Sequence, residues 1–308
     1  MKKLPIIFQL EEEIFFLFAF LNLTGYDQET NLRGMHWLRT FTRKKLREKL
    51  KVERYPLLKY FLSRRHQGQF VQWLLRKKYI PDDLAKIYLK KNLSFVQKFD
   101  KEFRKFINNE RKNLPLSETK KFYLTEKNNR YPKIVKVLHI LMKVLNINFD
   151  LLNLKKVIIT PNFLDSYNYG YGPKIGKIAF IVYGPLRSGD FRLIEHEFLH
   201  SVISPLLSRN KIFLRKLKKI SKNIFLKKQL EKKGYDDWAV IIEECFVRAM
   251  TIRAQSLNLK EKKLFLEKEN KKGFKFIEKI YDRLKNNYEE NELIDILNNI
   301  LNNIEEVL

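Results

Sequence analysis

Residues 190–204 read DFRLIEHEFLHSVIS, and this stretch determines how the rest of the chain is interpreted. It holds the pattern His-Glu-x-x-His at residues 196–200, within a segment that is otherwise largely apolar. Residues four apart lie on one face of an α-helix, one turn from each other. A helix that is apolar on most sides is buried, and its polar side chains then need partners. We therefore expect a buried helix that has Asp190 as its N-cap and ends at Ser204-Pro205.

The spacing of the two histidines predicts a metal site. His196 and His200 can present two imidazole nitrogens to one ion, and zinc accepts such nitrogens at about 2.0–2.1 Å. Glu197 lies beside them and can accept a proton from water that the ion activates. The alternative is a buried helix whose histidines are satisfied by neighbouring carboxylates. The chain has three more histidines, which are His36, His66 and His139. Each of these is isolated in the sequence, and we expect a structural role for it.

A third ligand has to come from downstream, because a catalytic zinc ion usually has three protein ligands and an open position for water. No histidine follows His200, so the ligand must be a carboxylate. The best source is the apolar segment WAVIIEECFVRAMTIRA, residues 238–254, which carries Glu243 and Glu244. From the residues alone, either glutamate can be the ligand.

The polar residues of this segment also have a simpler explanation. On a helical wheel one polar stripe contains Asp237, Glu244, Arg248 and Thr251, while Glu243 lies at the edge of the apolar surface. Such a stripe can face water, with Glu244 and Arg248 forming an ordinary i,i+4 ion pair. The two histidines upstream favour the metal-ligand interpretation.

Hydrophobic periodicity predicts an α+β fold that is predominantly helical, with a small sheet immediately before the HExxH helix. Residues 157–160 and 178–183 are β-branched or apolar runs closed by Pro161 and Gly184, and we expect both to be strands. Upstream, apolar residues recur at helical spacing in residues 14–23, 57–62, 70–75 and 134–145. Downstream, we expect helices near residues 190–204, 210–232, 236–256, 261–286 and 290–306.

The chain of 308 residues is long enough for one large domain or two modest ones. We expect a mostly helical basic region at residues 1–150 and the site-bearing region at 151–308, with one continuous compact domain as the alternative. Residues 108–130 are polar and contain Pro115, which favours a linker or a surface excursion. The apolar run at residues 14–23 is too short to span a bilayer, and we interpret it as a buried first helix of a cytoplasmic protein.

The composition is globular but strongly basic, because 62 Lys+Arg against 35 Asp+Glu give a net charge of +27. Such an excess is compatible with nucleic acid, an anionic surface or an acidic partner. The lysines are spread along the whole chain, however, and no compact nucleic-acid-binding motif occurs. The single cysteine, Cys245, cannot form an internal disulfide, and nothing favours an oxidising compartment.

Several stretches of the chain resemble the gluzincin superfamily of metallopeptidases. More narrowly, they resemble a gluzincin-like family of prokaryotic proteins described only as a domain of unknown function. The matching stretches are FLFAFLNLTGYD (residues 16–27), IAFIVYGP (178–185), HEFLHSVISPLL (196–207) and EECFVRAMTIR (243–253). The resemblance implies that the site-bearing region is a zincin-like catalytic region.

The resemblance also implies individual roles. At the matching positions, His196, His200 and Glu244 are zinc ligands, which favours Glu244 over its neighbour. Glu197 matches the general base. In gluzincins the strand before the active-site helix commonly binds substrate as an added β-strand, and here that strand is residues 178–183.

The chain departs from the gluzincin pattern in two respects. Glu244 follows His200 by 44 residues, more than in the best-known gluzincins, and a basic insert at residues 211–233 fills the gap. Arg248 stands where gluzincins often have an aspartate, and an arginine cannot accept a hydrogen bond from a ligand histidine. The residue that would stabilise an oxyanion is not identified. The candidates are Arg248 and five tyrosines, which are Tyr167, Tyr169, Tyr171, Tyr183 and Tyr235.

Together these features predict zinc-dependent hydrolysis of peptide bonds by a gluzincin mechanism, with a peptide or protein substrate that is preferentially acidic. Two other classes stay open. One is a basic helical protein that binds nucleic acid or an anionic surface, and the other is a zincin fold that has lost catalysis and has a structural role. The sequence leaves the endo- or exopeptidase mode and the oligomeric state undetermined.

Overall fold

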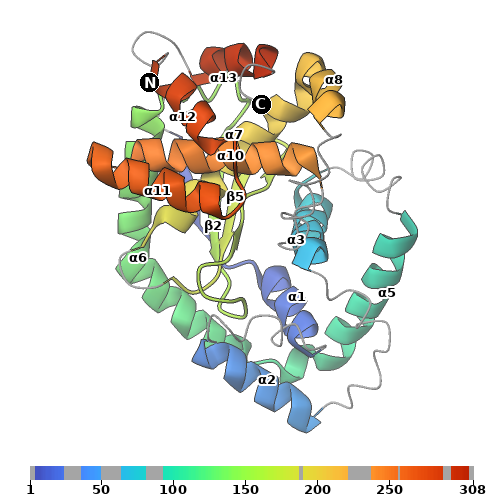
Figure 1. Ribbon diagram of the computed structural model, residues 1–308. Coiled ribbons are helices and arrows are strands. Elements are labelled where there is room, and N and C mark those ends of the chain that lie inside the picture. The colour runs from blue at the N-terminus through green and yellow to red at the C-terminus, as the bar shows by residue number, and fades with distance from the viewer. Residues whose placement is uncertain are drawn as a thin grey trace. The chain divides into compact units, whose positions relative to one another are not determined.

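The computed structural model describes residues 4–23, 36–49, 64–80, 93–186, 190–220, 237–255, 257–286 and 293–304. Over these residues the chain is predominantly helical and contains a small mixed sheet of five strands (Figure 1). The expected α+β class is therefore confirmed. None of the helices in these ranges combines the length and the apolar character that a membrane span requires. The helix expected at residues 57–62 lies outside the described ranges.

The helices before the central strands are α1 (Glu12–Leu23), α2 (Trp37–Lys49), α3 (Arg64–Tyr79), α5 (Leu93–Glu110), the 3-10 helix η5 (Arg111–Asn113) and α6 (Leu116–Val144). Those after them are α7 (Arg192–Arg209), α8 (Lys211–Ile220), α10 (Trp238–Ala254), α11 (Leu259–Lys271), α12 (Ile277–Asn286) and α13 (Leu293–Asn302). The strands are β1 (Ile6–Phe8), β2 (Lys156–Pro161), β3 (Gly170–Tyr171), β4 (Lys174–Ile175) and β5 (Ile178–Tyr183). The two expected strands, β2 and β5, are confirmed. The other three are only two or three residues long and carry too little periodicity to be predicted.

The chain divides into two compact units that are interleaved in sequence. The sheet unit comprises Pro5–Lys133 and Lys156–Leu193, and the helical unit comprises Met1–Leu4, Ile134–Lys155 and Ile194–Leu308. These boundaries differ from the expected division after residue 150, because β1 near the N-terminus pairs with β2 in the middle of the chain.

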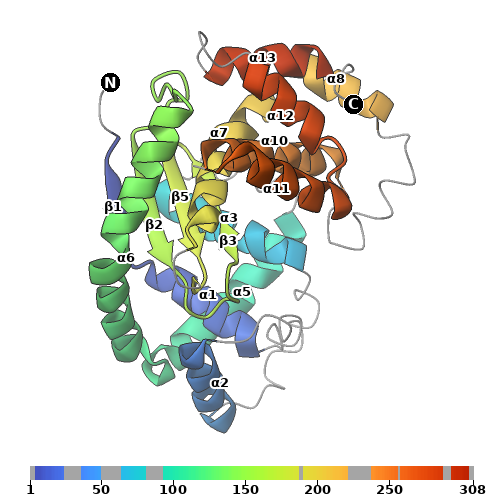
Figure 2. The same cartoon turned by 60° about the vertical axis from the view of Figure 1, so that its left-hand side comes forward.

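The sheet has the strand order β1-β2-β5-β3, and β4 also pairs with β5 (Figure 2). β2 is parallel to both of its neighbours, β1 and β5. All but the first residue of β2 and of β5 are buried, which explains why both strands read as nearly continuous apolar runs. The tight β4–β5 connection passes through Gly176, whose φ of 58° lies in the left-handed region that favours glycine.

Strand β5 is not a free edge of the sheet. On one side β2 pairs with all six of its residues. On the other side β4 pairs with its beginning and β3 with its end, and between them the Phe180 N–H donates to the Pro173 carbonyl at 2.9 Å. A substrate could add to β5 only by displacing β3 and β4. The expectation that residues 178–183 form a substrate-binding edge is therefore wrong, because the segment after β2 folds back onto that edge.

The opposite edge of the sheet, β1, is covered by tyrosines of α6. The Tyr131 hydroxyl donates to the Ile6 carbonyl at 2.6 Å, and the Tyr123 hydroxyl donates to the Phe8 carbonyl at 2.7 Å. An edge strand with unpaired carbonyls is a template for pairing with another chain. The two tyrosines occupy these carbonyls and so protect β1 from such pairing.

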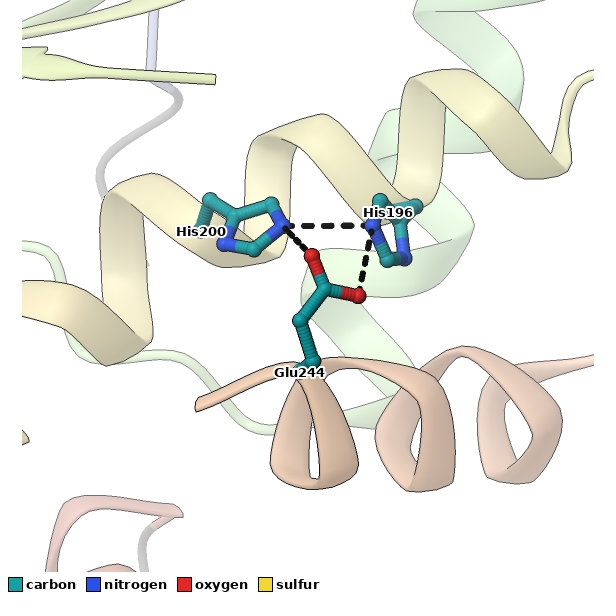
Figure 3. Close-up of side chains that lie close together, drawn as sticks. All are labelled: His196, His200 and Glu244. Atoms are coloured by element: carbon teal, nitrogen blue, oxygen red, sulfur yellow. Dashed lines mark hydrogen bonds and ion pairs between the residues drawn. The ribbon is translucent and has the colours of Figure 1, made fainter. Parts of the chain in front are cut away.

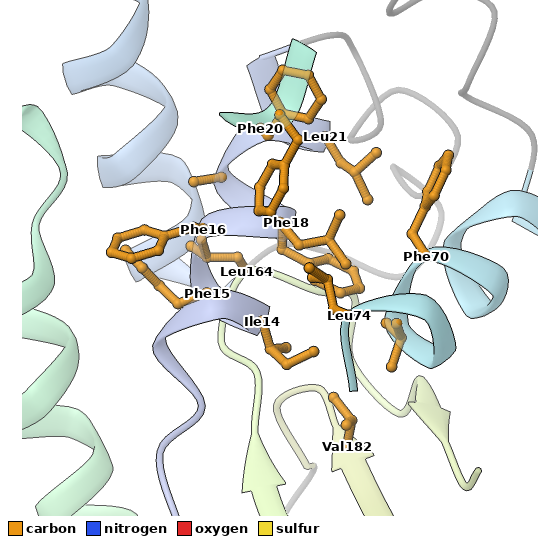
Figure 4. Packing of buried hydrophobic residues seen from close by; sticks show 14 of the residues in the cluster. Ile14, Phe15, Phe16, Phe18, Phe20, Leu21, Phe70, Leu74, Leu164 and Val182 are labelled. Atoms are coloured by element: carbon orange, nitrogen blue, oxygen red, sulfur yellow. The ribbon is translucent and has the colours of Figure 1, made fainter. Parts of the chain in front are cut away.

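The core of the sheet unit is built around α1, in which residues 14–23 are all buried (Figure 4). This confirms the expected buried first helix. α1 contacts α2, α3 and α5, so its apolar surface is covered on several sides. Asn22, the one polar residue in the run, donates to the carbonyls of Phe18 and Leu164. Its side-chain oxygen accepts from the buried Arg39 guanidinium at 2.7 Å, so the amide is satisfied inside the core.

Two expected interruptions of helices are absent. Residues 108–130 are not a linker but include the end of α5, η5 and the first half of α6, and α6 continues through Pro132. The polarity of this stretch reflects the exposed face of a helix. α7 does not stop at Ser204-Pro205 but continues to Arg209. An interior proline costs a helix about 3 kcal/mol, and burial of Leu207 beyond the proline offsets part of that cost.

One expected helix, residues 261–286, is instead two. α11 ends at Lys271 and α12 begins at Ile277, because Gly273 adopts a φ of 109°. The Phe274 N–H donates to the Glu269 carbonyl at 3.3 Å, and the Gly273 N–H donates to the Asn270 carbonyl at 2.9 Å. These are the two hydrogen bonds of a Schellman motif, which ends a helix at a glycine. In the helical unit α11 and α12 both contact α10, as does α8 (Figure 1).

We predict that Gly184→Ala destabilises the protein, because a Cβ at this position would lie 2.2 Å from the backbone oxygen of Ser166. Relieving such an overlap costs about 1–3 kcal/mol or more. In the matched control Gly68→Ala, the added Cβ would lie 3.6 Å from the Tyr171 ring, an ordinary contact, within helix α3. Alanine is there the better helix former by about 1 kcal/mol. Urea unfolding should show a lower midpoint for Gly184→Ala only, and equal midpoints for both variants would contradict the prediction.

Candidate metal centre

Helix α7 carries the HExxH pattern. The Asp190 carboxylate accepts a hydrogen bond from the backbone N–H of Arg192, the first residue of α7, at 3.1 Å, and also binds the Arg192 guanidinium. The expectation that Asp190 is the N-cap is therefore off by one residue, because α7 begins at Arg192 and the N-cap position is 191. Asp190 still satisfies a free donor at the helix start. Further along, Ile194, Phe198 and Leu199 are fully buried, as expected for an apolar helix.

The two histidines of α7 face each other. The Nε2 atoms of His196 and His200 are 3.1 Å apart (Figure 3). Helix α10 has Asp237 as its N-cap, whose carboxylate accepts from the Ala239 N–H, and it places Glu244 opposite this pair. One Glu244 oxygen, Oε1, lies 3.5 Å from the His200 Nε2, and the other, Oε2, lies 3.7 Å from the His196 Nε2. One potential ligand atom from each residue lies within 4.8 Å of the others, so the cluster can hold a metal ion.

The donor geometry fits a tetrahedral ion. Two donors that are about 2.0–2.1 Å from such an ion lie about 3.3–3.4 Å from each other. The Nε2–Nε2 separation of 3.1 Å and the Oε1–His200 Nε2 separation of 3.5 Å fall on either side of this value. With one ligand atom from each residue, all three atoms lie within 4.8 Å of one another, so side-chain shifts would bring them to such an ion. Two imidazole nitrogens and a carboxylate oxygen are donors that zinc accepts, although such sites select weakly among divalent metals.

The two adjacent glutamates of α10 have different partners. Glu244 faces the Nε2 atoms, whereas the Glu243 Oε1 lies 2.6 Å from the Nδ1 of His200. The Ser204 hydroxyl also contacts the Glu243 carboxylate. A carboxylate on the second nitrogen of a histidine orients the ring and raises its basicity as a ligand. Of the two candidates left open by the residue pattern, the structure thus places Glu244 with the histidine pair and Glu243 behind it.

Arg248 engages the same carboxylate that faces the histidines. Its Nε and Nη2 lie 2.9 and 2.8 Å from the Glu244 Oε2. Its Nη1 donates to the Glu269 Oε2 at 2.8 Å, and the guanidinium lies 4.3 Å from the centre of the Phe274 ring. Glu244 and Thr251 are both buried. The polar stripe of this helix therefore does not simply face water, and its ion pair is part of the site. Glu269 and Phe274 had no separate signal in the sequence apart from Gly273, which is typical of a helix end.

Burial dominates the electrostatics of the cluster. It lowers the pKa of His196 to about 3. Burial also lowers the pKa of His200, but hydrogen bonds and charges of Glu243 and Glu244 outweigh it and raise that pKa well above the usual value. For Glu244, burial raises the pKa, but Arg248 and the two histidines outweigh it and hold the carboxyl ionised. A protonated His200 between two carboxylates is thus an arrangement that needs no ion, and it is the alternative to a metal centre.

Glu197 lies next to His196 in the sequence and differs from the three cluster residues in the surroundings of its carboxylate. Its side chain is buried, with 6% of its surface exposed. In the part of the chain that the structure describes, no hydrogen bond or ion pair engages its carboxylate. Burial is the main cause that raises its pKa to about 8. Buried carboxylates are normally paired, so an unpaired one next to a potential metal cluster points to a chemical role.

The five tyrosine candidates belong to the sheet unit or fall outside the described residues. Tyr235 lies outside the described residues, and Tyr167, Tyr169, Tyr171 and Tyr183 belong to the sheet unit. The buried Tyr183 donates its hydroxyl to Glu126 at 3.3 Å, which is a structural contact. The structure therefore does not assign an oxyanion-stabilising residue among them.

The structural role expected of His36 is supported. Its Nδ1 accepts from the backbone N–H of Leu38 at 3.2 Å at the start of α2, and its ring packs against Trp37, Phe122 and Phe163. His139 is half-buried on α6, and the side chain of His66 lies outside the described part of α3.

A family model described as Domain of unknown function (DUF4932) matches residues 89–298, and the chain belongs to this family. The matched residues include α7 and α10, and therefore every residue of the candidate metal centre. No curated protein and no solved structure is significantly similar to the chain. The reasons for a function therefore come from the site itself.

We predict that the purified protein binds one divalent metal ion per chain, and that His196→Ala and Glu244→Ala abolish this binding because each removes one of three ligands. His139→Ala is the matched control, because it removes a histidine of the same unit that contacts none of the three. Elemental analysis after dialysis provides the measurement. Absence of metal from the wild-type protein after reconstitution with zinc would support the ion-pair alternative.

Replacing Glu243 or Glu244 with glutamine should affect metal binding differently. Glu244→Gln is expected to lose the metal, because an amide oxygen is a poor zinc ligand. Glu243→Gln is expected to keep one ion per chain, and Glu243→Ala to bind it about 10–100-fold more weakly, as is typical when the partner of a ligand histidine is removed. Competition with a chromogenic chelator measures these affinities. Loss of the metal from Glu243→Gln with retention in Glu244→Gln would reverse the assignment.

Proposed function

We propose that this protein is a zinc-dependent hydrolase of peptide bonds. The observation that carries the proposal is Glu197, on the helix whose two histidines converge with Glu244. Its side chain is buried, and within the described ranges no hydrogen bond or ion pair engages its carboxylate. A structural cluster has no need of such a group, since leaving a carboxylate buried and unpaired is costly. A hydrolase needs one, because a base must take a proton from the attacking water.

His196, His200 and Glu244 would hold the zinc ion. The ion, when bound, supplies Lewis acidity that lowers the pKa of water. The three side chains leave a position open for that water, which is the arrangement of catalytic rather than structural zinc sites. Glu243 would hold the His200 ring through its Nδ1 and so keep the other nitrogen directed into the site.

Glu197 would act as general base and then as general acid. Its carboxylate accepts the proton of the attacking water and passes it to the leaving amine. In the absence of an ion, its pKa is raised to about 8, so most of this carboxyl is protonated near neutral pH. Positive charge nearby favours the ionised form that the first step requires.

The peptide class of the substrate rests on the resemblance to gluzincins, and the net charge of +27 favours acidic substrates. Addition of the substrate to β5 is not part of the proposal, because both edges of that strand are occupied. A peptide would have to be held by other groups around the open side of the metal.

We predict that Glu197→Gln keeps the metal and lowers the rate of peptide cleavage by about 10²–10⁴-fold, because the amide cannot accept the proton. Cleavage of a mixture of unstructured peptides, followed by mass spectrometry, measures the rate together with the metal content. Glu267→Gln, on the exposed side of α11, controls for the preparation. Equal activity of Glu197→Gln and the wild-type protein would falsify the general-base role.

Metal content and peptide cleavage, together with binding to nucleic acid or vesicles, distinguish the hydrolase from the two other classes of protein. A protein that holds one zinc ion per chain and cleaves no peptide is the inactive zincin fold with a structural role. A protein that holds no metal but binds nucleic acid or anionic vesicles in a salt-dependent way is the basic binding protein.

A further inference from the structure

The two oxygens of the Glu244 carboxylate are in unequal surroundings. Oε2 faces two N–H donors of Arg248, at 2.9 and 2.8 Å from Nε and Nη2. The Nε–H donates a hydrogen bond to Oε2, and Nη2 adds an ion-pair contact to the same oxygen. Oε1 makes no such contact with Arg248 and lies 3.5 Å from the Nε2 of His200. Oε2 lies 3.7 Å from the Nε2 of His196, so both oxygens border the histidine pair, but Arg248 engages only Oε2.

Arg248 is itself held on its far side. Its Nη1 donates to the Glu269 Oε2 at 2.8 Å, and its guanidinium lies over the Phe274 ring at 4.3 Å. Glu269 is in turn paired with Lys272. Glu269 and Phe274 occupy the two ends of the hydrogen bond that closes the Schellman motif after α11. The left-handed Gly273 thus brings an anion and an aromatic face to the same guanidinium, which limits the movement of Arg248.

We propose that Arg248 is a positioning residue that makes Glu244 a one-oxygen ligand, presented through Oε1. The inference rests on the proposed metal centre. Carboxylates can bind a metal ion through one oxygen or through both. If Glu244 used both, one more coordination position would be filled by protein, and less room would remain for water and substrate. By engaging Oε2, Arg248 keeps that position open.

This role explains the unusual arginine. Gluzincins often have an aspartate at this position, four residues after the ligand glutamate, where it can accept a hydrogen bond from a ligand histidine. Here Glu243 already contacts the Nδ1 of His200, so an acid at position 248 is not needed for that purpose. The position is instead used to orient the ligand carboxylate, for which the planar fork of arginine is suited and lysine is not.

Cobalt(II) provides the test, because its visible absorption is strong in four-coordinate sites and becomes weaker as the coordination number rises. We expect the wild-type protein to give a four-coordinate spectrum. Arg248→Met, which removes the fork and the charge, should weaken the absorption and lower cobalt affinity about 10–100-fold. Arg248→Lys keeps the charge but not the fork, so it should show the same spectral change with a smaller loss of affinity. Lys268→Met, which removes an exposed positive charge from α11, should change neither.

Wild-type spectrum and affinity in both Arg248 variants would overturn the positioning role and leave the metal centre intact. If Arg248→Met fails to fold, as judged by circular dichroism, Arg248→Lys and Glu269→Gln decide, since Glu269→Gln keeps the arginine but removes its charged anchor. A wild-type protein that binds no cobalt overturns both the metal centre and this inference. Cobalt binding with the expected spectral changes but no peptide cleavage would overturn only the hydrolase, and the positioning role would stand.

Discussion

The burial of ionisable side chains between α7 and α10 is the constraint on which the helical unit depends. An unpaired charge in a protein interior costs several kcal/mol. In this cluster Glu244 is buried, and 17% and 18% of the His196 and His200 side chains are exposed. Two of the three groups have partners that compensate their burial: Glu243 for His200, and Arg248 for Glu244. Glu197 has no such partner among the described residues, and the hydrolysis proposed above would use its carboxylate as the base.

The compensation also links the site to distant parts of the helical unit. Arg248 can stay beside Glu244 because Glu269 and Phe274 hold its other side, and these two residues meet there only because the chain turns at Gly273. α11 and α12 both contact α10, so the turn between them is held against the helix that carries the glutamates. A helix end some 25 residues downstream of Glu244 is in this way part of the surroundings of a potential metal ligand.

Much of the fold follows from local patterns. The continuous apolar runs of α1, β2 and β5 predict buried elements because each run is long enough to show its environment. The prediction of a linker at residues 108–130 was wrong, because an exposed helix face and a linker have the same polar composition. β3 and β4 were missed because two-residue strands exist only through their pairing with β5, and that pairing closes the edge that a substrate would need. The sequence of β5 does not indicate which segments pair with its edges.

For the candidate site, too, some features follow from the sequence alone and others only from the tertiary structure. The sequence by itself determined that His196 and His200 share one helix face, because that relation depends only on the pitch of an α-helix. It also favoured a carboxylate as the third ligand of a possible metal site, because no histidine follows His200. Only the tertiary structure decided between Glu243 and Glu244. Adjacent residues on a helix point about 100° apart, and which of them faces α7 depends on how α10 is rotated by its packing against α8, α11 and α12.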